Sequence, residues 1–326
     1  MSMSLNEVKS RLKGVIPVQF CPYTKEGELD IEGLKENTKF LVDFARDKDI
    51  VVMTNGSCTE FYANSLEEQK KVIKTVVDTV AGKVPVVAGV GQAGAIETIE
   101  MAKYAEEVGV DCAVVVLPYY HAPTKEGMYR YFKAVAEAVN IGIIVYNYAA
   151  VSGALIPPDL MRRLSKIDNI VATKDNATSV TDYAFKALTI DPEDMVLIAG
   201  LGEVHYIGAA AYGFRYKGFV SVIANFAPSL SYAVYQAVEE ENFKKAYEAL
   251  KKQLPLWKLI AEFGSKRESI SIIPEGLRAN YMYMGVGKAA MELVGLNGGP
   301  LRLPMEDLTN EEKKELEEVL KGMGII

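Results

Sequence analysis

Short apolar runs rich in β-branched residues recur along the first three quarters of the chain, separated by longer segments with apolar residues at helical spacing. The short runs show little alternation of apolar and polar residues, which is typical of parallel strands buried on both faces. The pattern predicts eight strands, at residues 14–20, 50–54, 84–90, 112–117, 142–147, 169–173, 195–200 and 218–223.

Amphipathic helices are predicted between these strands. The segment 66–80 follows Ser65, a plausible N-cap, and the segment 96–109 ends at Gly109, a plausible C-cap. Eight strand–helix units favour an α/β fold of the (β/α)8 TIM barrel type, which typically takes about 250 residues. A doubly wound sheet is the rival architecture, but it seldom contains eight such units in unbroken alternation.

The predicted strands stop at about residue 240. The segments 241–264, 273–285 and 309–323 have helical patterns and are expected to pack on the barrel or on a neighbouring subunit. We therefore predict a barrel domain at 12–240 and a C-terminal helical extension at 241–326.

Composition describes an ordinary globular protein, with 49% hydrophobic and 24% charged residues among 326. A net charge of −7 argues against nucleic acid as a partner, because phosphate binding draws on a surplus of lysine and arginine. No apolar run approaches the roughly 20 residues that cross a bilayer, so no membrane partner is expected. The widely spaced cysteines and the charged N-terminal segment favour a cytoplasmic location.

Metal chemistry is not predicted. The two histidines, His121 and His205, are too few and too scattered for a three-ligand site. The three cysteines, Cys21, Cys58 and Cys112, form no CxxC pair.

In a barrel, reactive groups come from the C-terminal ends of the strands and the loops that follow. Lys174 directly follows the predicted strand 169–173, and Tyr146 lies at the end of the neighbouring predicted strand. A lysine desolvated by apolar walls has a lowered pKa and can attack a carbonyl as a neutral amine, while a tyrosine can carry protons. This pair predicts Schiff-base chemistry; an exposed lysine paired with Asp175 is the ordinary alternative.

Two further segments stand at predicted strand ends. The loop "GSCTE" (56–60) offers hydroxyls and successive backbone N–H groups that suit a carboxylate, although a tight turn that caps a helix fits equally well. The segment "PYY" (118–120) places two aromatic residues at the barrel rim, where packing or subunit contacts are the more common role.

The segment "GVGQAG" (89–94) satisfies the GxGxxG pattern of dinucleotide-binding proteins and follows a predicted strand. Its acidic partner should end the next strand, whereas Asp111 precedes the strand 112–117. A nicotinamide-dependent oxidoreductase is therefore the weaker hypothesis from another class.

Several motifs together resemble the dihydrodipicolinate synthase / N-acetylneuraminate lyase family over about residues 12 to 250: "GSCTEF", "PYYHAP", "VYNYAAVSG", "IVATKDNAT" and "GFVSVIANFAP". The resemblance implies a (β/α)8 barrel with C-terminal helices. It also implies an enzyme that condenses, cleaves or dehydrates 2-oxo acids through a lysine imine, without a metal or an organic cofactor.

The resemblance assigns roles by position in the motifs. Lys174 matches the imine lysine and Tyr146 the proton-relay tyrosine. Ser57 and Cys58 match the pair in the loop that holds the 2-oxo acid carboxylate. Val220 matches the position where the backbone of strand 8 flanks the bound keto acid.

The resemblance also implies a homo-oligomer, a tetramer or a dimer, because many members assemble in this way. Tyr120 matches the tyrosine that reaches into the neighbouring subunit's active site in many of them. It is predicted to be a catalytic residue on that ground alone.

Three departures from the family pattern set expectations about the substrate. Cys58 replaces the second hydroxyl of the carboxylate loop and Thr59 replaces its glycine. Val151 stands where the synthase branch carries an arginine that binds a second carboxylate, and a valine cannot supply that bidentate contact. We therefore expect a lyase or aldolase for pyruvate or a keto-deoxy sugar acid rather than a true dihydrodipicolinate synthase. A keto-deoxy sugar-acid dehydratase and a non-catalytic metabolite sensor are the alternatives.

Overall fold

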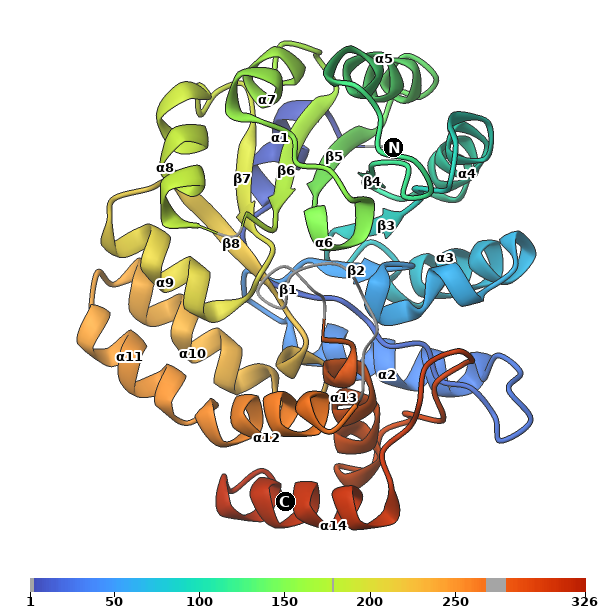
Figure 1. Cartoon of the computed structure of the whole chain (residues 1–326), viewed down its shortest axis with the longest axis vertical. Coiled ribbons are helices and arrows are strands. Elements are labelled where there is room, and N and C mark those ends of the chain that lie inside the picture. Colours follow the sequence, from blue (N-terminus) through green and yellow to red (C-terminus); the bar gives the residue numbers. More distant parts are fainter. Residues whose placement is uncertain (1–2, 178, 268–279) are drawn as a thin grey trace.

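The computed structural model describes residues 3–177, 179–267 and 280–326. Within them, eight parallel strands form a barrel that is surrounded by helices (Figure 1). The strands are β1 (Gly14–Pro17), β2 (Val52–Thr54), β3 (Val86–Gly89), β4 (Cys112–Val116), β5 (Gly142–Asn147), β6 (Ile170–Asp175), β7 (Val196–Ala199) and β8 (Tyr216–Ser221). The predicted (β/α)8 TIM barrel is confirmed.

The sheet closes between its first and last strands. β1 pairs with β8 in parallel, starting from Gly14 opposite Gly218. Isolated bridges from Val15 to Ile50 and from Val18 to Met53 join β1 to the segment around β2. Gly14 and Gly218 allow this closure, because a Cβ on Gly218 would lie 2.3 Å from the Gly14 carbonyl oxygen.

Side chains of each strand alternate between two apolar clusters. The outer cluster lies between the strands and the surrounding helices, and includes Val52, Val115 and Val145. The inner cluster occupies the barrel interior and continues into the C-terminal helices. It includes Ile16, Met53, Val114, Ile144, Tyr146, Ala172, Ile198 and Val220, together with Met284 and Leu316 from the extension.

The barrel helices cover the outside of the sheet (Figure 1). They are α2 (Ile31–Phe44), α3 (Leu66–Val80), α4 (Ala95–Val108), α5 (Lys125–Ala136), α7 (Pro158–Leu164), α8 (Val180–Thr189), α9 (Glu203–Ala211) and α10 (Pro228–Glu239), with short α1 (Leu5–Arg11) and α6 (Ala149–Ser152). Ser65 caps α3 through a capping box with Glu68, and Gly109 ends α4 in a left-handed conformation, so both predicted caps are confirmed.

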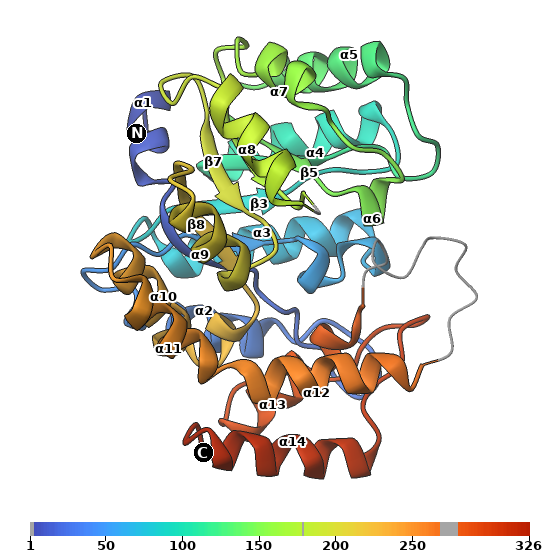
Figure 2. The ribbon, with the colours of Figure 1, turned by 60° about the vertical axis from the view of Figure 1, so that its left-hand side comes forward.

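The predicted C-terminal helices form a group that lies beside the barrel (Figure 2). The segment predicted as one helix at 241–264 is two, α11 (Phe243–Lys251) and α12 (Leu254–Ser265), because Pro255 fits only the first turn of a helix. Residues 273–279 of the next predicted helix lie outside the described residues, and α13 (Met282–Leu293) follows them. α14 (Asn310–Gly322) matches the last predicted helix. The division at residue 240 stays a prediction.

No helix within the described ranges is long and apolar enough to cross a membrane.

Candidate active site

Lys174 lies inside a strand rather than after it. It is the fifth residue of β6, so the predicted end of this strand at residue 173 is wrong. The strand continues because β6 is paired on both sides, with Tyr146 of β5 opposite Lys174 on one side and Ile198 of β7 on the other. Lys174 shares its face with Ala172 of the inner cluster, so its side chain points into the barrel.

The Lys174 amine is buried and carries no ion pair with the described residues. Only 5% of the residue is exposed, and Nζ lies 3.5 Å from the centroid of the Tyr146 ring. Burial lowers the pKa of Lys174 from 10.5 to about 7, because the charged form loses its hydration. A substantial fraction of the amine is therefore neutral and nucleophilic near neutral pH.

Asp175 faces away from the amine, as the next residue of a strand must. Its Oδ1 accepts a hydrogen bond from Lys186 Nζ at 2.9 Å, with both side chains fully buried. The ordinary alternative, a surface pair between Lys174 and Asp175, is therefore wrong.

Five of the six predicted site residues line one cavity of about 280 Å³ at the C-terminal end of the strands: Lys174, Tyr146, Ser57, Cys58 and Val220. Lys174 is the only lysine or arginine among the described residues that line it. The structure therefore brings an amine, a phenol and the candidate carboxylate loop to one cavity.

Tyr146 is held between Lys174 and the loop. Its ring stacks on Tyr148 with 5.7 Å between centroids, and its phenol lies close to the Ser57 side chain. Burial raises the pKa of Tyr146 well above its usual value, so the phenol keeps its proton near neutral pH. It can donate that proton to an oxygen bound nearby and take it back.

The loop 56–60 forms a 3₁₀ turn at Ser57–Thr59. Its Thr59 Oγ1 donates to the Gln19 carbonyl at 2.7 Å and accepts from the Gly56 N–H at 3.2 Å. The turn thus forms without the family's glycine, because the Thr59 hydroxyl closes it. Within the described residues, no hydrogen bond uses the backbone N–H groups of Ser57 and Cys58. Two free N–H groups and the Ser57 hydroxyl suit a bound carboxylate.

The Cys58 thiol is a poor donor in this loop. Burial raises its pKa to about 12, although the nearby Lys174 amine and Tyr283 hydroxyl act in the opposite direction. The thiol therefore stays protonated and contributes a weaker hydrogen bond than the hydroxyl it replaces.

Tyr120 is the one predicted site residue outside the cavity. It is 81% exposed and makes an edge contact with His121 at 4.8 Å between ring centroids. Within a single chain it reaches neither Lys174 nor the loop, and its assigned role across a subunit interface stays a prediction.

The other lining residues are not among the predicted site residues. Three of them have a buried polar atom without a hydrogen-bond partner in the described residues: Asn176 Oδ1, Glu203 Oε2 and Trp257 Nε1. Tyr283 is another. Trp257 and Tyr283 belong to the C-terminal extension, and nothing in their local sequence signals a contact with the barrel mouth.

Glu203 begins α9 and keeps one carboxylate oxygen occupied. Its Oε1 accepts hydrogen bonds from Ser221 Oγ at 2.8 Å and Ser231 Oγ at 2.6 Å. Burial raises the pKa of this carboxyl above its usual value.

The segment "GVGQAG" does not have the surroundings of a dinucleotide site. Asp111 precedes β4, and its Oδ2 accepts the Val86 N–H at 2.7 Å, at the start of β3 and so at the opposite end of the barrel from this loop. Gly89 and Gly91 instead permit close backbone packing, since a Cβ would approach Asn55 O to 2.1 Å and Val116 Cγ1 to 2.7 Å respectively.

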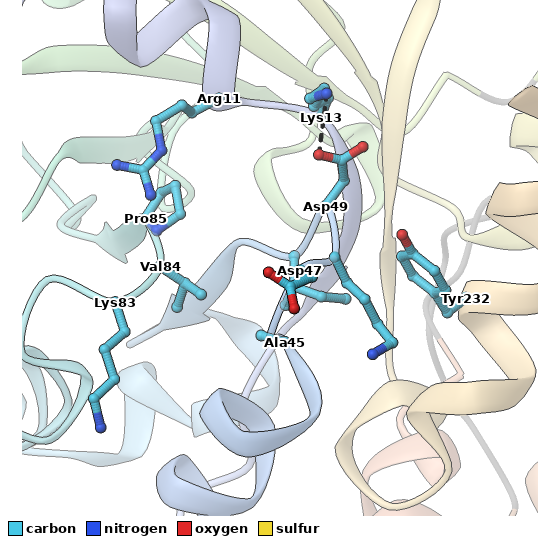
Figure 3. A pocket seen from close by; sticks show the side chains of 11 residues that line it. Arg11, Lys13, Ala45, Asp47, Asp49, Lys83, Val84, Pro85 and Tyr232 are labelled. Atoms are coloured by element: carbon cyan, nitrogen blue, oxygen red, sulfur yellow. Dashed lines mark ion pairs between the residues drawn. The ribbon is translucent and has the colours of Figure 1, made fainter.

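A second hollow of about 270 Å³ lies at the N-terminal end of the strands, next to Ile50 and Pro85 (Figure 3). Lys13 in its wall is paired with Asp49 at 3.0 Å. The charged ends of Arg11 and Lys83 lie apart in Figure 3, with Pro85 and Val84 between them in the view, so they do not converge on one anion. This end of a barrel usually serves stability.

Comparison with known proteins bears on the chemistry of the first cavity. The family model described as the dihydrodipicolinate synthetase family matches residues 11–323. The chain belongs to this family.

Curated members of the dihydrodipicolinate synthetase family cover almost the whole chain. A 4-hydroxy-tetrahydrodipicolinate synthase of Archaeoglobus fulgidus is 32% identical over 96% of this chain and 99% of its own length. The enzyme of the same name from Methanocaldococcus jannaschii is 33% identical over 96% and 99%. These names do not support the expectation that the chain lacks dihydrodipicolinate synthase activity.

Solved structures of the family have the same fold. Dihydrodipicolinate synthase from Aquifex aeolicus superposes with a TM-score of 0.83 at 30% identity, covering 96% of this chain and 99% of that one. YagE from E. coli K12, solved in complex with pyruvate, gives 0.83 at 25% identity and covers 97% and 99%. The family consists of lyases of the class I aldolase type, and this chain is such an enzyme.

Proposed function

We propose that this protein forms a Schiff base between Lys174 and pyruvate or a longer 2-oxo acid. The single observation that carries the proposal is the Lys174 amine, buried against the Tyr146 ring in a cavity that Ser57 and Cys58 also line, and without an ion pair to any described residue. Burial keeps part of the amine neutral, and only a neutral amine attacks a carbonyl.

Each residue of the cavity has a separate role in the proposed reaction. Lys174 Nζ adds to the C2 carbonyl, and the carbinolamine loses water when its oxygen is protonated. We assign that proton to the Tyr146 phenol, which lies close to the Ser57 side chain. The free N–H groups of Ser57 and Cys58 hold the carboxylate, and Val220 forms the wall beside the keto acid. The imine then permits loss of a proton or cleavage of a bond at C3.

Two specific reactions fit this scheme. The first is the synthesis that gives the relatives their name, here proposed as a condensation with pyruvate, the compound bound in the YagE structure, as one substrate. The second is cleavage or dehydration of a keto-deoxy sugar acid. It is favoured by buried polar atoms of Glu203, Asn176 and Trp257 that have no hydrogen-bond partner in the described part of the chain, because such atoms suit a substrate bearing hydroxyl groups.

Val151 also favours the second reaction. It lines a small hollow of about 20 Å³ that shares Ser57 and Tyr146 with the main cavity. No lysine or arginine of the described residues lines that hollow, so nothing there would bind a second carboxylate.

We further propose a cytoplasmic homo-oligomer, a tetramer or a dimer. The three cysteines, all described, are free and buried, as in a reducing compartment. The exposed Tyr120 would then have a neighbouring subunit to reach.

A substrate panel tests the proposal and separates the two reactions. The enzyme is assayed for condensation of pyruvate with a carboxylate-bearing aldehyde, and for pyruvate release or water loss from 2-oxo-3-deoxy sugar acids. We expect turnover in one of these two assays, and we expect Lys174→Ala to show none. Turnover with none of these 2-oxo acids would contradict the proposed function.

A further inference from the structure

The last residue of the carboxylate loop is held in an unfavourable state. Glu60 has a left-handed backbone with φ of 54°, which a residue with a side chain adopts rarely. Its carboxylate is also completely buried. A buried charge is costly unless it is paired and hydrogen-bonded, so its partners determine whether the loop keeps this shape.

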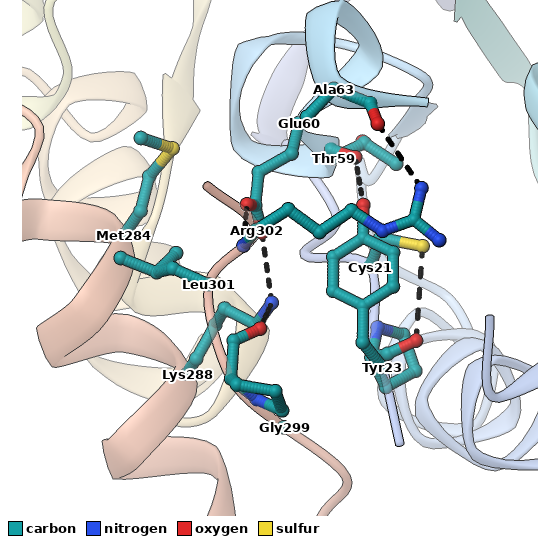
Figure 4. Close-up of polar contacts among 12 residues, drawn as sticks. Cys21, Tyr23, Thr59, Glu60, Ala63, Met284, Lys288, Gly299, Leu301 and Arg302 are labelled. Atoms are coloured by element: carbon teal, nitrogen blue, oxygen red, sulfur yellow. Dashed lines mark hydrogen bonds and ion pairs between the residues drawn. The ribbon is translucent and has the colours of Figure 1, made fainter. Parts of the chain in front are cut away.

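Those partners come from the C-terminal extension (Figure 4). Glu60 Oε1 accepts from Lys288 Nζ of α13 at 2.8 Å, and Oε2 accepts from the backbone N–H of Arg302 at 2.8 Å. Lys288 is 2% exposed and also donates to the Pro300 carbonyl at 2.6 Å. Both oxygens of the loop carboxylate are thus satisfied by residues more than 220 positions later in the chain.

Tyr23 connects the same cations to the loop. Its ring centroid lies 4.4 Å from Lys288 Nζ and 4.3 Å from Arg302 Cζ. Its hydroxyl approaches the Thr59 carbonyl at 3.3 Å and donates to Asn64 Oδ1 at 2.7 Å. Arg302 in turn pairs with Glu68 of α3 at 2.6 Å. The far end of the loop is therefore fixed from two sides.

The near end of the loop carries the groups that face the substrate. Ser57 and Cys58 line the cavity, whereas the Glu60 carboxylate points away to Lys288. The Glu60 N–H donates to Ser57 O at 3.1 Å, so a change in the Glu60 backbone moves the turn itself. The Glu60–Lys288 pair has no net charge, so it affects the cavity through the position of the loop rather than through electrostatic attraction.

We infer that the Glu60–Lys288 ion pair is a positioning device for the substrate carboxylate, through which the C-terminal extension sets the direction of the Ser57 and Cys58 N–H groups. This inference rests on the proposed function. Glu60 and Lys288 touch no substrate and are positioning residues. A pair that only attached the extension to the barrel would affect stability without affecting the preference for carboxylates.

The test compares two carbonyl compounds in Lys288→Met. Imine formation is measured by borohydride trapping and intact mass, with pyruvate and with acetone, which has the ketone but no carboxylate. We expect trapping of pyruvate to fall about tenfold or more, the effect of losing well-placed hydrogen bonds to a charged group. Trapping of acetone should be unchanged, because the Lys174 amine is untouched.

Two further variants separate position from stability. Arg267→Leu is the matched control, since Arg267 pairs with Glu312 inside the extension and should leave both trapping rates unchanged. The double variant Glu60→Gln/Lys288→Met removes both buried charges. Its melting temperature should be close to that of wild type, whereas its trapping of pyruvate should stay as low as in Lys288→Met.

A readout without substrate distinguishes failure of this inference from failure of the proposed function. Loosening the loop should raise the rate of Cys58 alkylation by N-ethylmaleimide about tenfold in folded Lys288→Met, with buried Cys112 as internal reference. If wild type traps neither compound, the proposed function fails while the alkylation arm still tests the loop. Unchanged Cys58 alkylation in Lys288→Met would overturn the inference. If wild type traps both compounds, the same pyruvate-to-acetone trapping ratio in Lys288→Met as in wild type would also overturn it.

Discussion

Lys174 was identifiable from the sequence because a charge at the end of a buried apolar strand requires an explanation. Its neighbour Tyr146 was identifiable because both residues end adjacent strands of a barrel. The structure adds a cause for the proposed reactivity, which is burial against the Tyr146 ring without a carboxylate partner among the described residues. That cause depends on neighbours from other strands and could not be read from the local sequence.

The lowered pKa of Lys174 has a consequence for stability. The unfolded chain keeps the proton up to pH 10.5, whereas the folded chain releases it from about pH 7. The unfolded state therefore binds more protons between these values, and the wild type gains stability as the pH rises through this window. Below about pH 7 the full penalty of the buried amine applies.

Lys174→Met should therefore be more stable than wild type at pH 6, by a few kcal/mol at about 1.4 kcal/mol per pKa unit. The advantage should shrink steadily toward pH 10, where the unfolded lysine also loses its proton. Urea unfolding of both proteins at several pH values measures the difference. A difference that does not change with pH would contradict the lowered pKa.

Other site residues could not have been found at the residue scale. Glu203 follows a glycine-rich turn and was not distinguished from an ordinary helix start. Trp257 and Tyr283 come from helices whose docking on the barrel mouth has no sequence signal. Such contacts depend on long-range packing, which a periodicity analysis does not contain.

At the scale of elements, the end of β6 is fixed by a buried polar cluster on its outer face. Asp175 accepts hydrogen bonds from Lys186 of α8, from Asn147 of β5 at 2.9 Å and from Tyr216 of β8 at 3.0 Å. The cluster explains why β6 extends through Lys174 and Asp175, where the sequence predicted a loop. The predicted strand stopped before the charged residues Lys174 and Asp175. In the structure, Lys174 faces the barrel interior and Asp175 faces the outer polar cluster.

Lys186→Met should destabilise the protein by about 3–5 kcal/mol, because it leaves Asp175 buried without its cation. Asp175→Asn/Lys186→Met should recover most of that loss. Denaturant unfolding measures both. The control Lys74→Met breaks an exposed pair with Asp78 and should change stability by about 0.5 kcal/mol or less. If Lys186→Met were as stable as the control Lys74→Met, the role assigned to the polar cluster would be contradicted.

The strand and helix pattern was largely predictable, because burial on both faces makes parallel strands continuous apolar runs. All eight predicted strands are present, with ends shifted by a few residues. The break between α11 and α12 was signalled by Pro255 and was overlooked. The hydroxyls and backbone N–H groups of loop 56–60 predict a carboxylate site and a helix cap equally well, and only the family resemblance favours the carboxylate.

At the scale of the whole molecule, the barrel and the extension share one apolar cluster and one active-site cavity. Tyr120 is exposed at the rim in a single chain, so its proposed catalytic role requires a second subunit. Tyr120→Phe should lower turnover at least about tenfold, as loss of a proton-transfer group does, while leaving imine trapping at Lys174 intact.

The control for this variant is Tyr212→Phe, which removes a hydroxyl from another exposed tyrosine, at the end of α9. Sedimentation velocity of each variant reports whether the assembly persists. Unchanged turnover of Tyr120→Phe in an intact oligomer would count against the role.

The central claim is that Lys174 forms an imine with a 2-oxo acid. The most direct measurement is borohydride reduction in the presence of pyruvate, followed by intact mass and peptide mapping. We expect one adduct per chain, with the mass of pyruvate less one oxygen, located on Lys174 and absent from Lys174→Ala. With pyruvate and keto-deoxy sugar acids each tried, no adduct, or an adduct on another lysine, would contradict it.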